Sequence, residues 1–151
     1  MFVRCWWRWC RLYGEAGLIG VAYAPGVTRA TADVTTTETT TSTSYTDLAT
    51  SGPAVTITPG RSTDQFIAIS AYGRCTTDGS TAHMSVAIAG AGAADVDSLG
   101  VIGTSGGAFA KVGAHALPTG VANGATHTAK YRTTAGTGSF ANRRVSAFTL
   151  S

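Results

Sequence analysis

The chain has little charge and no long apolar run, and both shortages exclude classes of protein. Only 13% of its 151 residues are charged. From residue 31 onward, two lysines and five arginines balance six aspartates and one glutamate, whereas a nucleic-acid-binding surface needs clustered Lys and Arg. No stretch approaches the roughly 20 apolar residues that a membrane-spanning helix requires. We therefore expect neither a nucleic-acid partner nor a membrane partner.

Cysteine and histidine are too scarce and too scattered to predict a disulfide framework or a metal site. The chain has three cysteines, an odd number without recurring spacing, and Cys75 is expected to be a small buried filler near a strand end. The histidines, His83, His115 and His127, are far apart and have no partner at zinc-ligand spacing. Asp95 and Asp97 allow a weak calcium site, but a solvated loop is the preferred interpretation. We expect no metal and no cofactor.

Motifs for catalysis are also missing. There is no Gly-x-Ser-x-Gly nucleophile motif. The glycine-rich pieces at 90–92 and 103–107 lack the Lys-Ser or Lys-Thr that follows a phosphate-binding loop. Glu15 and Glu38 are the only glutamates, so no opposed carboxylate pair for glycoside hydrolysis can be singled out. We predict that the chain is not an enzyme.

The first 30 residues differ from the rest. Residues 1–13 contain all three tryptophans, mixed with Arg and Cys, and three interpretations stay open. Trp with Arg is typical of a membrane-surface or partner-docking peptide. Val21–Ala24 resembles the small-residue cleavage site of a signal peptide, although Glu15 and Pro25 disfavour it. The third is a loose linker, or a segment that is not native coding sequence, because a one-base shift of the Cys5–Cys10 codons encodes three glycines, a variable residue and Ala or Val at each end, as in a glycine-rich linker.

What the chain does have is Thr, Ser, Ala, Val and Gly, which suit short strands joined by tight turns. Thr35–Thr46, with eight threonines, is expected to form an extended edge strand. Gln65–Tyr72 is apolar on both faces and reads as a central strand covered on both sides. Alternation predicts that Val55, Ile57, Met84, Val86 and Ile88 point inward. Further strands are expected at 108–112 and in two C-terminal runs around a glycine turn.

These patterns predict an all-β fold. About eight short strands without helical periodicity favour an antiparallel β-sandwich, jelly-roll-like or immunoglobulin-like. We expect residues 31–151 to form this domain and residues 1–30 to form a poorly structured N-terminal extension or linker. Because large apolar residues are few, packing against sister copies would help to stabilise it. We therefore expect a homo-oligomer, for example a trimer.

Two parts of the sequence carry a family resemblance. Thr41–Thr58, together with Thr126–Arg132 and Gly136–Arg144, resembles a β-sandwich module of structural proteins in tailed bacteriophages, especially those that infect actinobacteria. The resemblance implies a head-decoration, fibre or tail-associated protein, located in the virion and contacting major capsid or tail proteins. It implies no catalytic residues. The N-terminal 29 residues depart from the family pattern, which leaves the mode of attachment to the particle open.

The expected function is therefore that of a non-enzymatic virion structural protein that decorates or stabilises a capsid or tail. The alternative is a glycan-binding module of a receptor-binding fibre, with host cell-wall glycan as partner, because sandwich lectins stack sugars on exposed aromatic rings. Tyr72 and Phe109 are aromatic candidates. The residues chosen for subunit or glycan contact are Tyr131, Phe140, Asn142, Arg143 and Arg144.

Overall fold

The computed structural model describes residues 2–6, 9–14, 17–23, 28–57, 64–95, 98–103 and 107–149. Nine of the described strands form a β-sandwich, in which two antiparallel sheets pack face to face. Their bounds are β4 Arg29–Val34, β5 Glu38–Thr40, β6 Ala54–Thr56, β7 Gln65–Cys75, β8 Thr81–Ala87, β9 Leu99–Ile102, β10 Ala110–Ala116, β11 Thr126–Thr133 and β12 Gly138–Thr149. The all-β prediction is confirmed.

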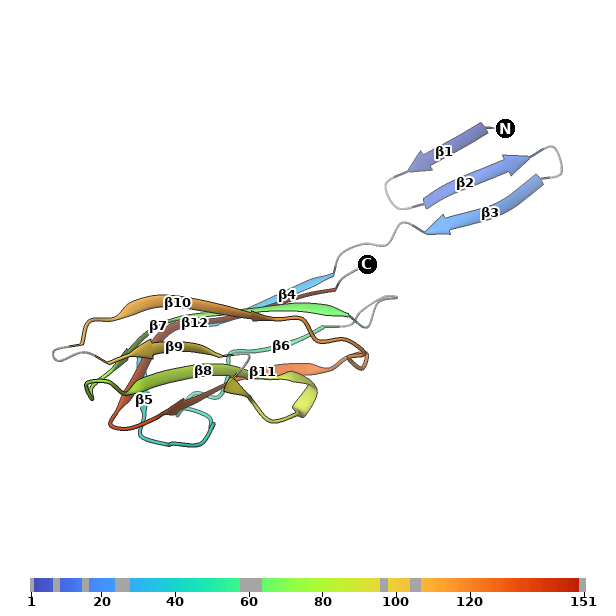
Figure 1. Ribbon diagram of the computed structural model, residues 1–151. Helices are drawn as coiled ribbons and strands as arrows, with labels where there is room; N and C mark the ends of the chain where they lie inside the picture. The colour runs from blue at the N-terminus through green and yellow to red at the C-terminus, as the bar shows by residue number, and fades with distance from the viewer. Residues whose placement is uncertain are drawn as a thin grey trace.

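The order of the strands is that of a jelly roll. One sheet runs β10-β7-β12-β4, with β5 also paired to β12, and the other runs β6-β11-β8-β9. Figure 1 shows the two layers, with β10, β7 and β12 in one and β9, β8 and β11 in the other. The first and last strands of the sandwich, β4 and β12, are neighbours, whereas β8 and β9 form a hairpin within one sheet. Two Greek keys wound in this way define the jelly roll.

The N-terminal segment contains three further strands, β1 Phe2–Trp6, β2 Trp9–Gly14 and β3 Gly17–Tyr23. They pair as an antiparallel sheet in the order β1-β2-β3, and the register places Cys5 opposite Cys10. The sandwich begins at Arg29, two residues before the predicted boundary.

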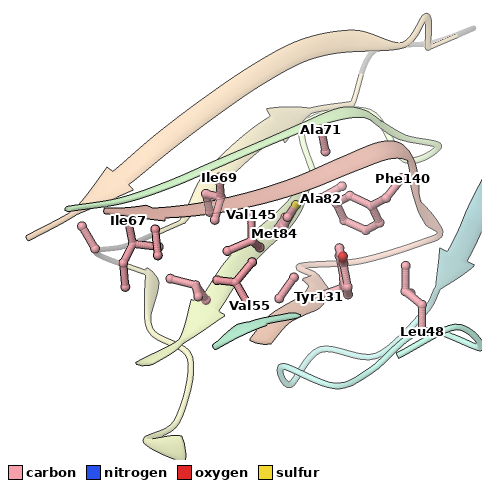
Figure 2. Close-up of a cluster of buried hydrophobic side chains, with 14 of the residues drawn as sticks. Leu48, Val55, Ile67, Ile69, Ala71, Ala82, Met84, Tyr131, Phe140 and Val145 are labelled. Carbon is pink, nitrogen blue, oxygen red and sulfur yellow. The ribbon is translucent and has the colours of Figure 1, made fainter. Parts of the chain in front are cut away.

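Alternation of side chains explains why these segments form strands around a core. In β11, every second residue from His127 to Thr133 is buried while Lys130 and Arg132 point outward. Period-2 alternation of this kind lets each strand bury one face and expose the other. Strands of both sheets contribute to the interior: Val55, Ile67, Ile69, Ala71, Ala82, Met84, Tyr131, Phe140 and Val145 surround it, and Leu48 closes one end (Figure 2).

Most of the predicted core positions are confirmed. Val55, Ile57, Met84 and Val86 are buried. The Ile88 side chain is only partly buried because β8 ends at Ala87 and a short 3-10 turn, Ile88–Gly90, follows. Cys75 is buried at the last position of β7, as expected of a small filler.

Two expectations about strands are wrong in extent. The Thr-rich run is not one long edge strand. Within it only Glu38–Thr40 is a strand, and Thr46 forms a single bridge to Tyr131. The predicted central strand, β7, is covered on one face only: the alternate side chains Phe66, Ala68, Ser70 and Tyr72 keep part of their surface exposed.

Candidate functional site

Tyr131 and Phe140 lie in the core and not on a contact surface. Neither side chain has any exposed surface, and their ring centroids are 4.9 Å apart. The Tyr131 hydroxyl donates a 2.8 Å hydrogen bond to the carbonyl oxygen of Gly52, and burial raises the pKa of Tyr131. The prediction that these rings contact a glycan or a neighbouring subunit is therefore wrong. The sequence held a signal for this burial. Lys130 and Arg132 flank Tyr131 and point outward, so alternation along the strand turns Tyr131 inward.

Arg143 is also buried, because the chain bulges at Asn142. The pairing of β12 with β7 shifts by one residue between Ala141 and Arg144, and Asn142 has a φ of 46°. The bulge turns Arg143 to the same inner side as Phe140, as an extra residue in one strand reverses the alternation beyond it. There the Arg143 guanidinium lies 2.9 Å from Glu38 and 5.3 Å from the Tyr131 ring. Arg143 is thus a structural residue and not a contact residue.

The two remaining predicted residues, Asn142 and Arg144, do lie at the surface and line one hollow together. It has a volume of about 320 Å³, lies on the outer side of the β10-β7-β12-β4 sheet, and is also lined by Asp33, Thr35, Ser70, Tyr72 and Lys111. We call it the Tyr72 hollow.

Two of its charged groups, Asp33 and Arg144, are paired with each other. Arg144 donates to both carboxylate oxygens of Asp33 at 2.6 and 3.0 Å, and this contact holds the pKa of Asp33 below its ordinary value. The Lys111 ammonium lies 5.9 Å from the centre of the Tyr72 ring.

The same outer face carries an aromatic cluster at the other end of β7. The Phe66 ring stacks on His115 at 5.6 Å and meets Phe148 at 6.1 Å. Between this cluster and Tyr72, Ala68 lies between His115 of β10 and Ser146 of β12, and Ser70 lies between Gly113 of β10 and Arg144 of β12. The middle of the outer face of β7 therefore carries small side chains, and the Asp33–Arg144 ion pair lies beside them. Phe109, the other aromatic candidate, is exposed beside the sheet and lies under the Arg74 guanidinium.

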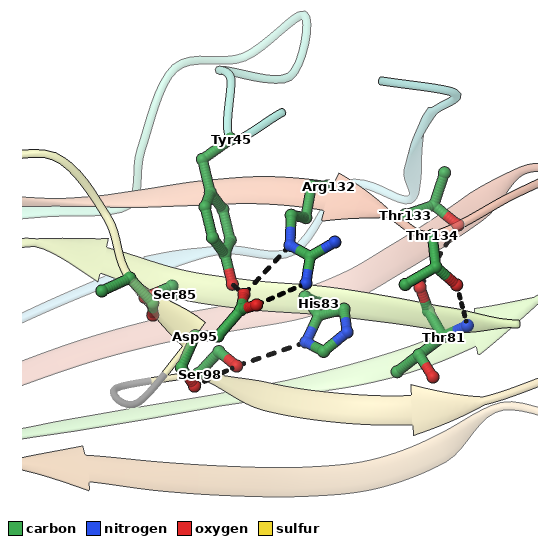
Figure 3. Close-up of polar contacts among 10 residues, drawn as sticks. Tyr45, Thr81, His83, Ser85, Asp95, Ser98, Arg132, Thr133 and Thr134 are labelled. Carbon is green, nitrogen blue, oxygen red and sulfur yellow. Dashed lines mark hydrogen bonds and ion pairs between the residues drawn. The ribbon is translucent and has the colours of Figure 1, made fainter. Parts of the chain in front are cut away.

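A second polar site lies on the opposite sheet, where two loops meet β11 (Figure 3). Tyr45 donates a 2.7 Å hydrogen bond from its hydroxyl to Oδ1 of Asp95. Arg132 donates to both carboxylate oxygens of Asp95, at 3.0 and 2.7 Å, and its guanidinium lies 5.4 Å from the centre of the Tyr45 ring. Because both oxygens of Asp95 are engaged in this way, the calcium interpretation loses its first ligand, and Asp97 lies outside the described residues.

Ser98 continues this network. It donates to the carbonyl oxygen of Asp95 at 2.8 Å and lies 3.2 Å from Nδ1 of His83. Since the Ser98 proton goes to Asp95, Nδ1 of His83 is the donor in its contact with Ser98. The network therefore fixes the tautomer of His83 as well as the position of the Asp95 loop.

The histidines do not converge on a catalytic or metal centre. His127 is fully buried; its Nε2 lies 2.7 Å from Oε1 of Gln65, and Nδ1 accepts a hydrogen bond from the Ala89 amide. His83 belongs to the Asp95 network, and His115 stacks on the other sheet. Among the residues that the structure describes, no three His, Cys, Asp or Glu side chains are grouped closely enough to hold a metal ion.

No model of a known protein family matches the chain, and no curated protein matches it at a significant level. Within the described residues, no helix has the length and apolar character needed to cross a membrane.

Proposed function

We propose that this chain is a non-enzymatic structural protein of a virus particle, a jelly-roll module that assembles with copies of itself and with capsid or tail proteins. The observation that carries the proposal is the outer face of β7. Its apolar side chains are partly exposed, while the other face of the same strand is fully buried. Exposed rings such as Tyr72, gathered with small side chains on one face, are typical of an interaction surface.

The charges of the domain support an assembly role. The four described ion pairs are Asp33–Arg144, Glu38–Arg143, Asp47–Lys130 and Asp95–Arg132, and each links segments far apart in the sequence. Each pair neutralises a charge within the chain, and on the outer face Asp33 neutralises Arg144 in this way. The cores of interfaces are depleted in charge, and the small side chains of Ala68 and Ser70 offer such an uncharged centre.

The fold is compatible with both candidate functions. Jelly rolls occur in viral capsid proteins and in lectins. Because one fold serves many functions, the strand order alone does not choose between them. The resemblance of the chain to tailed-phage structural modules favours the particle as its location.

A substitution in the middle of the outer face tests self-assembly. Ala68→Arg places a charge among the small residues there, and its side chain points outward, so the isolated domain keeps its fold. We expect light scattering to find a homo-oligomer for the wild type and smaller species for Ala68→Arg. The control is Ala54→Arg, on the exposed side of β6, which should leave the assembly intact. A wild type that is monomeric at all concentrations would contradict self-assembly.

Mass spectrometry of gradient-purified particles from the source culture tests the location. Peptides from this chain in stoichiometric amounts are expected, and their copy number separates decoration of the head from a place in the tail. Protein found only free, or bound to cell walls, would argue against the virion.

We propose glycan binding as a second function of the chain. The observation that favours it is the aromatic ring of Tyr45, which lies among hydroxyl groups and small residues in a groove on the opposite sheet.

A further inference from the structure

We propose that the groove beside Tyr45 binds a neutral saccharide chain. This inference rests on the second function proposed above, glycan binding, and is independent of the structural role. The groove lies on the outer side of the β6-β11-β8-β9 sheet, opposite the face that we assign to assembly, so a saccharide and a neighbouring subunit do not compete for the same surface.

The groove consists of two hollows that adjoin at Tyr45. One has a volume of about 540 Å³ and the other of about 340 Å³, and both are lined by Tyr45, Gly92 and Ala93. Both hollows are open to solvent, so they suit a ligand that lies along the surface. Two linked hollows along one ring suit successive units of a chain better than a single compact ligand.

The chemistry of the lining matches a ligand with many hydroxyl groups. Thr43 and Ser44 line the first hollow, and Thr126 and Thr128 line the second. The wall formed by residues 90–94 contains only glycine and alanine, which lets a ligand approach the backbone. The Tyr45 ring supplies an aromatic surface for the C–H groups of a sugar. Hydroxyl groups, small side chains and one ring together favour a saccharide over an apolar peptide.

The charges at the groove favour a neutral ligand. Arg132 is engaged by Asp95 through two hydrogen bonds, and Lys130 lies 2.7 Å from Asp47. An anionic ligand would have to displace a carboxylate from one of these cations. Because a bidentate arginine–carboxylate pair is among the stronger polar contacts, such displacement is unfavourable. Both cations are therefore already neutralised by carboxylates of the chain, which favours an uncharged ligand.

Hydrogen bonds hold the residues that line the groove in place. The Tyr45 hydroxyl is held by Asp95, and the loop that carries Asp95 is held to β8 by a 2.6 Å hydrogen bond from Ser85 to the carbonyl oxygen of Ala94. The loop of residues 41–51 is held to β11 by the backbone bonds between Thr46 and Tyr131. A site whose side chains are already ordered loses less entropy on binding.

Titration calorimetry on the full chain tests the inference. The probes are neutral oligosaccharides of glucose, galactose, mannose and N-acetylglucosamine, with uronate-containing oligosaccharides as the anionic comparison. We expect saturable binding to at least one neutral probe and no tighter binding to the anionic set. Absence of binding to every neutral probe, or preference for the anionic set, would overturn the proposal.

Two variants locate the site. Tyr45→Ala removes the ring, and we expect it to weaken binding about tenfold or more, a loss of about 1.4 kcal/mol. Gly92→Leu fills the groove: a Cβ at Gly92 meets no heavy atom within 4 Å, and its φ is not in the left-handed region, so the fold should persist while binding is lost. Gly92→Leu therefore tests the site even if Tyr45→Ala unfolds the domain.

Tyr72→Ala on the other sheet is the matched control and should bind like the wild type. Binding that survives Gly92→Leu, or that is lost in Tyr72→Ala, would overturn the assignment to this groove. The assembly role is tested separately. Gly92→Leu leaves the outer face of β7 unchanged and should assemble like the wild type, so loss of saccharide binding and loss of assembly are distinguishable.

Discussion

At the scale of single residues, the unusual feature is a charged side chain inside the core. The Arg143 side chain has no exposed surface, and that of its partner Glu38 is 10% exposed. Two of the guanidinium nitrogens, Nε and Nη1, have no hydrogen-bond partner. A buried ion pair adds little net stability, but breaking it leaves an uncompensated charge in the interior.

We therefore predict that Arg143→Met lowers the free energy of unfolding by about 3–5 kcal/mol, because Glu38 loses its cationic partner and keeps only its hydrogen bonds from Thr50. The double variant Arg143→Met with Glu38→Gln should recover most of the loss, since no buried charge remains. Chemical denaturation of the three proteins measures both effects. Arg144→Ala, which breaks the solvent-exposed pair with Asp33, is the control and should cost little. Equal losses for Arg143→Met and Arg144→Ala would contradict this account.

His127 predicts a dependence of stability on pH. Burial lowers the pKa of His127 below its ordinary value of about 6.5. The Ala89 amide donates to Nδ1, so protonation at that nitrogen would also break a hydrogen bond. The folded state thus binds fewer protons than the unfolded state near this pH, and stability falls as the pH falls.

We expect the free energy of unfolding to be highest above pH 6.5, with respect to His127, and to decrease as the pH is lowered toward 5. His127→Gln should remove part of this slope, and His83, whose pKa is also lowered by burial, should account for a further part. Denaturation curves recorded between pH 8 and pH 5 measure the slopes. A slope unchanged by His127→Gln would show that another group is responsible.

At the scale of elements, the bulge in β12 decides which side chains face the core. It depends on Asn142, which takes a left-handed backbone conformation that asparagine tolerates and β-branched residues do not. Since the Asn142 side chain is exposed, a substitution there acts mainly through the backbone.

We predict that Asn142→Val destabilises the domain by about 1–2 kcal/mol, because valine is strained at a positive φ. Asn142→Gly should be neutral or slightly stabilising, as glycine adopts this conformation freely. Thermal unfolding of the two variants measures the difference. If valine were tolerated as well as glycine, the bulge would not depend on the residue at this position.

At the scale of the whole molecule, the sandwich has a closed core whose described residues lie between Leu48 and Ala147. The strand that begins it, β4, pairs with β12 along its whole length. Each of the two sheets therefore offers a separate outer face, one proposed for assembly and one for a saccharide.

We predict that the chain without residues 1–27 folds and keeps the melting temperature of the full chain within a few degrees, because the contacts described for the sandwich are made among residues 28–149. Thermal unfolding followed by circular dichroism measures this. A truncated chain that is unfolded, or that melts far below the full chain, would show that the first 27 residues support the sandwich. The same protein tests whether those residues are needed for assembly.

The sequence by itself determined the class of fold and most of the inward positions. Val55, Met84 and the runs that became β11 and β12 were predictable because alternation with period two is a local property of a strand. The neutral body and the scattered histidines were equally visible without a structure. The extent of β5 could not be predicted, because every residue of a threonine run is compatible with a strand. Only the pairing with β12 limits the strand to Glu38–Thr40.

Only the tertiary structure decided which surfaces are available. The bulge at Asn142 reversed the alternation beyond Phe140 and turned Arg143 inward, and one irregular residue of this kind leaves no period in the sequence. In the groove beside Tyr45, Asp95 binds two side chains that are distant in the sequence. Tyr45 lies 50 residues before Asp95, and Arg132 lies 37 residues after it. Contacts between such distant segments depend on how the loops pack on the sheet, and that packing exists only once both sheets have formed.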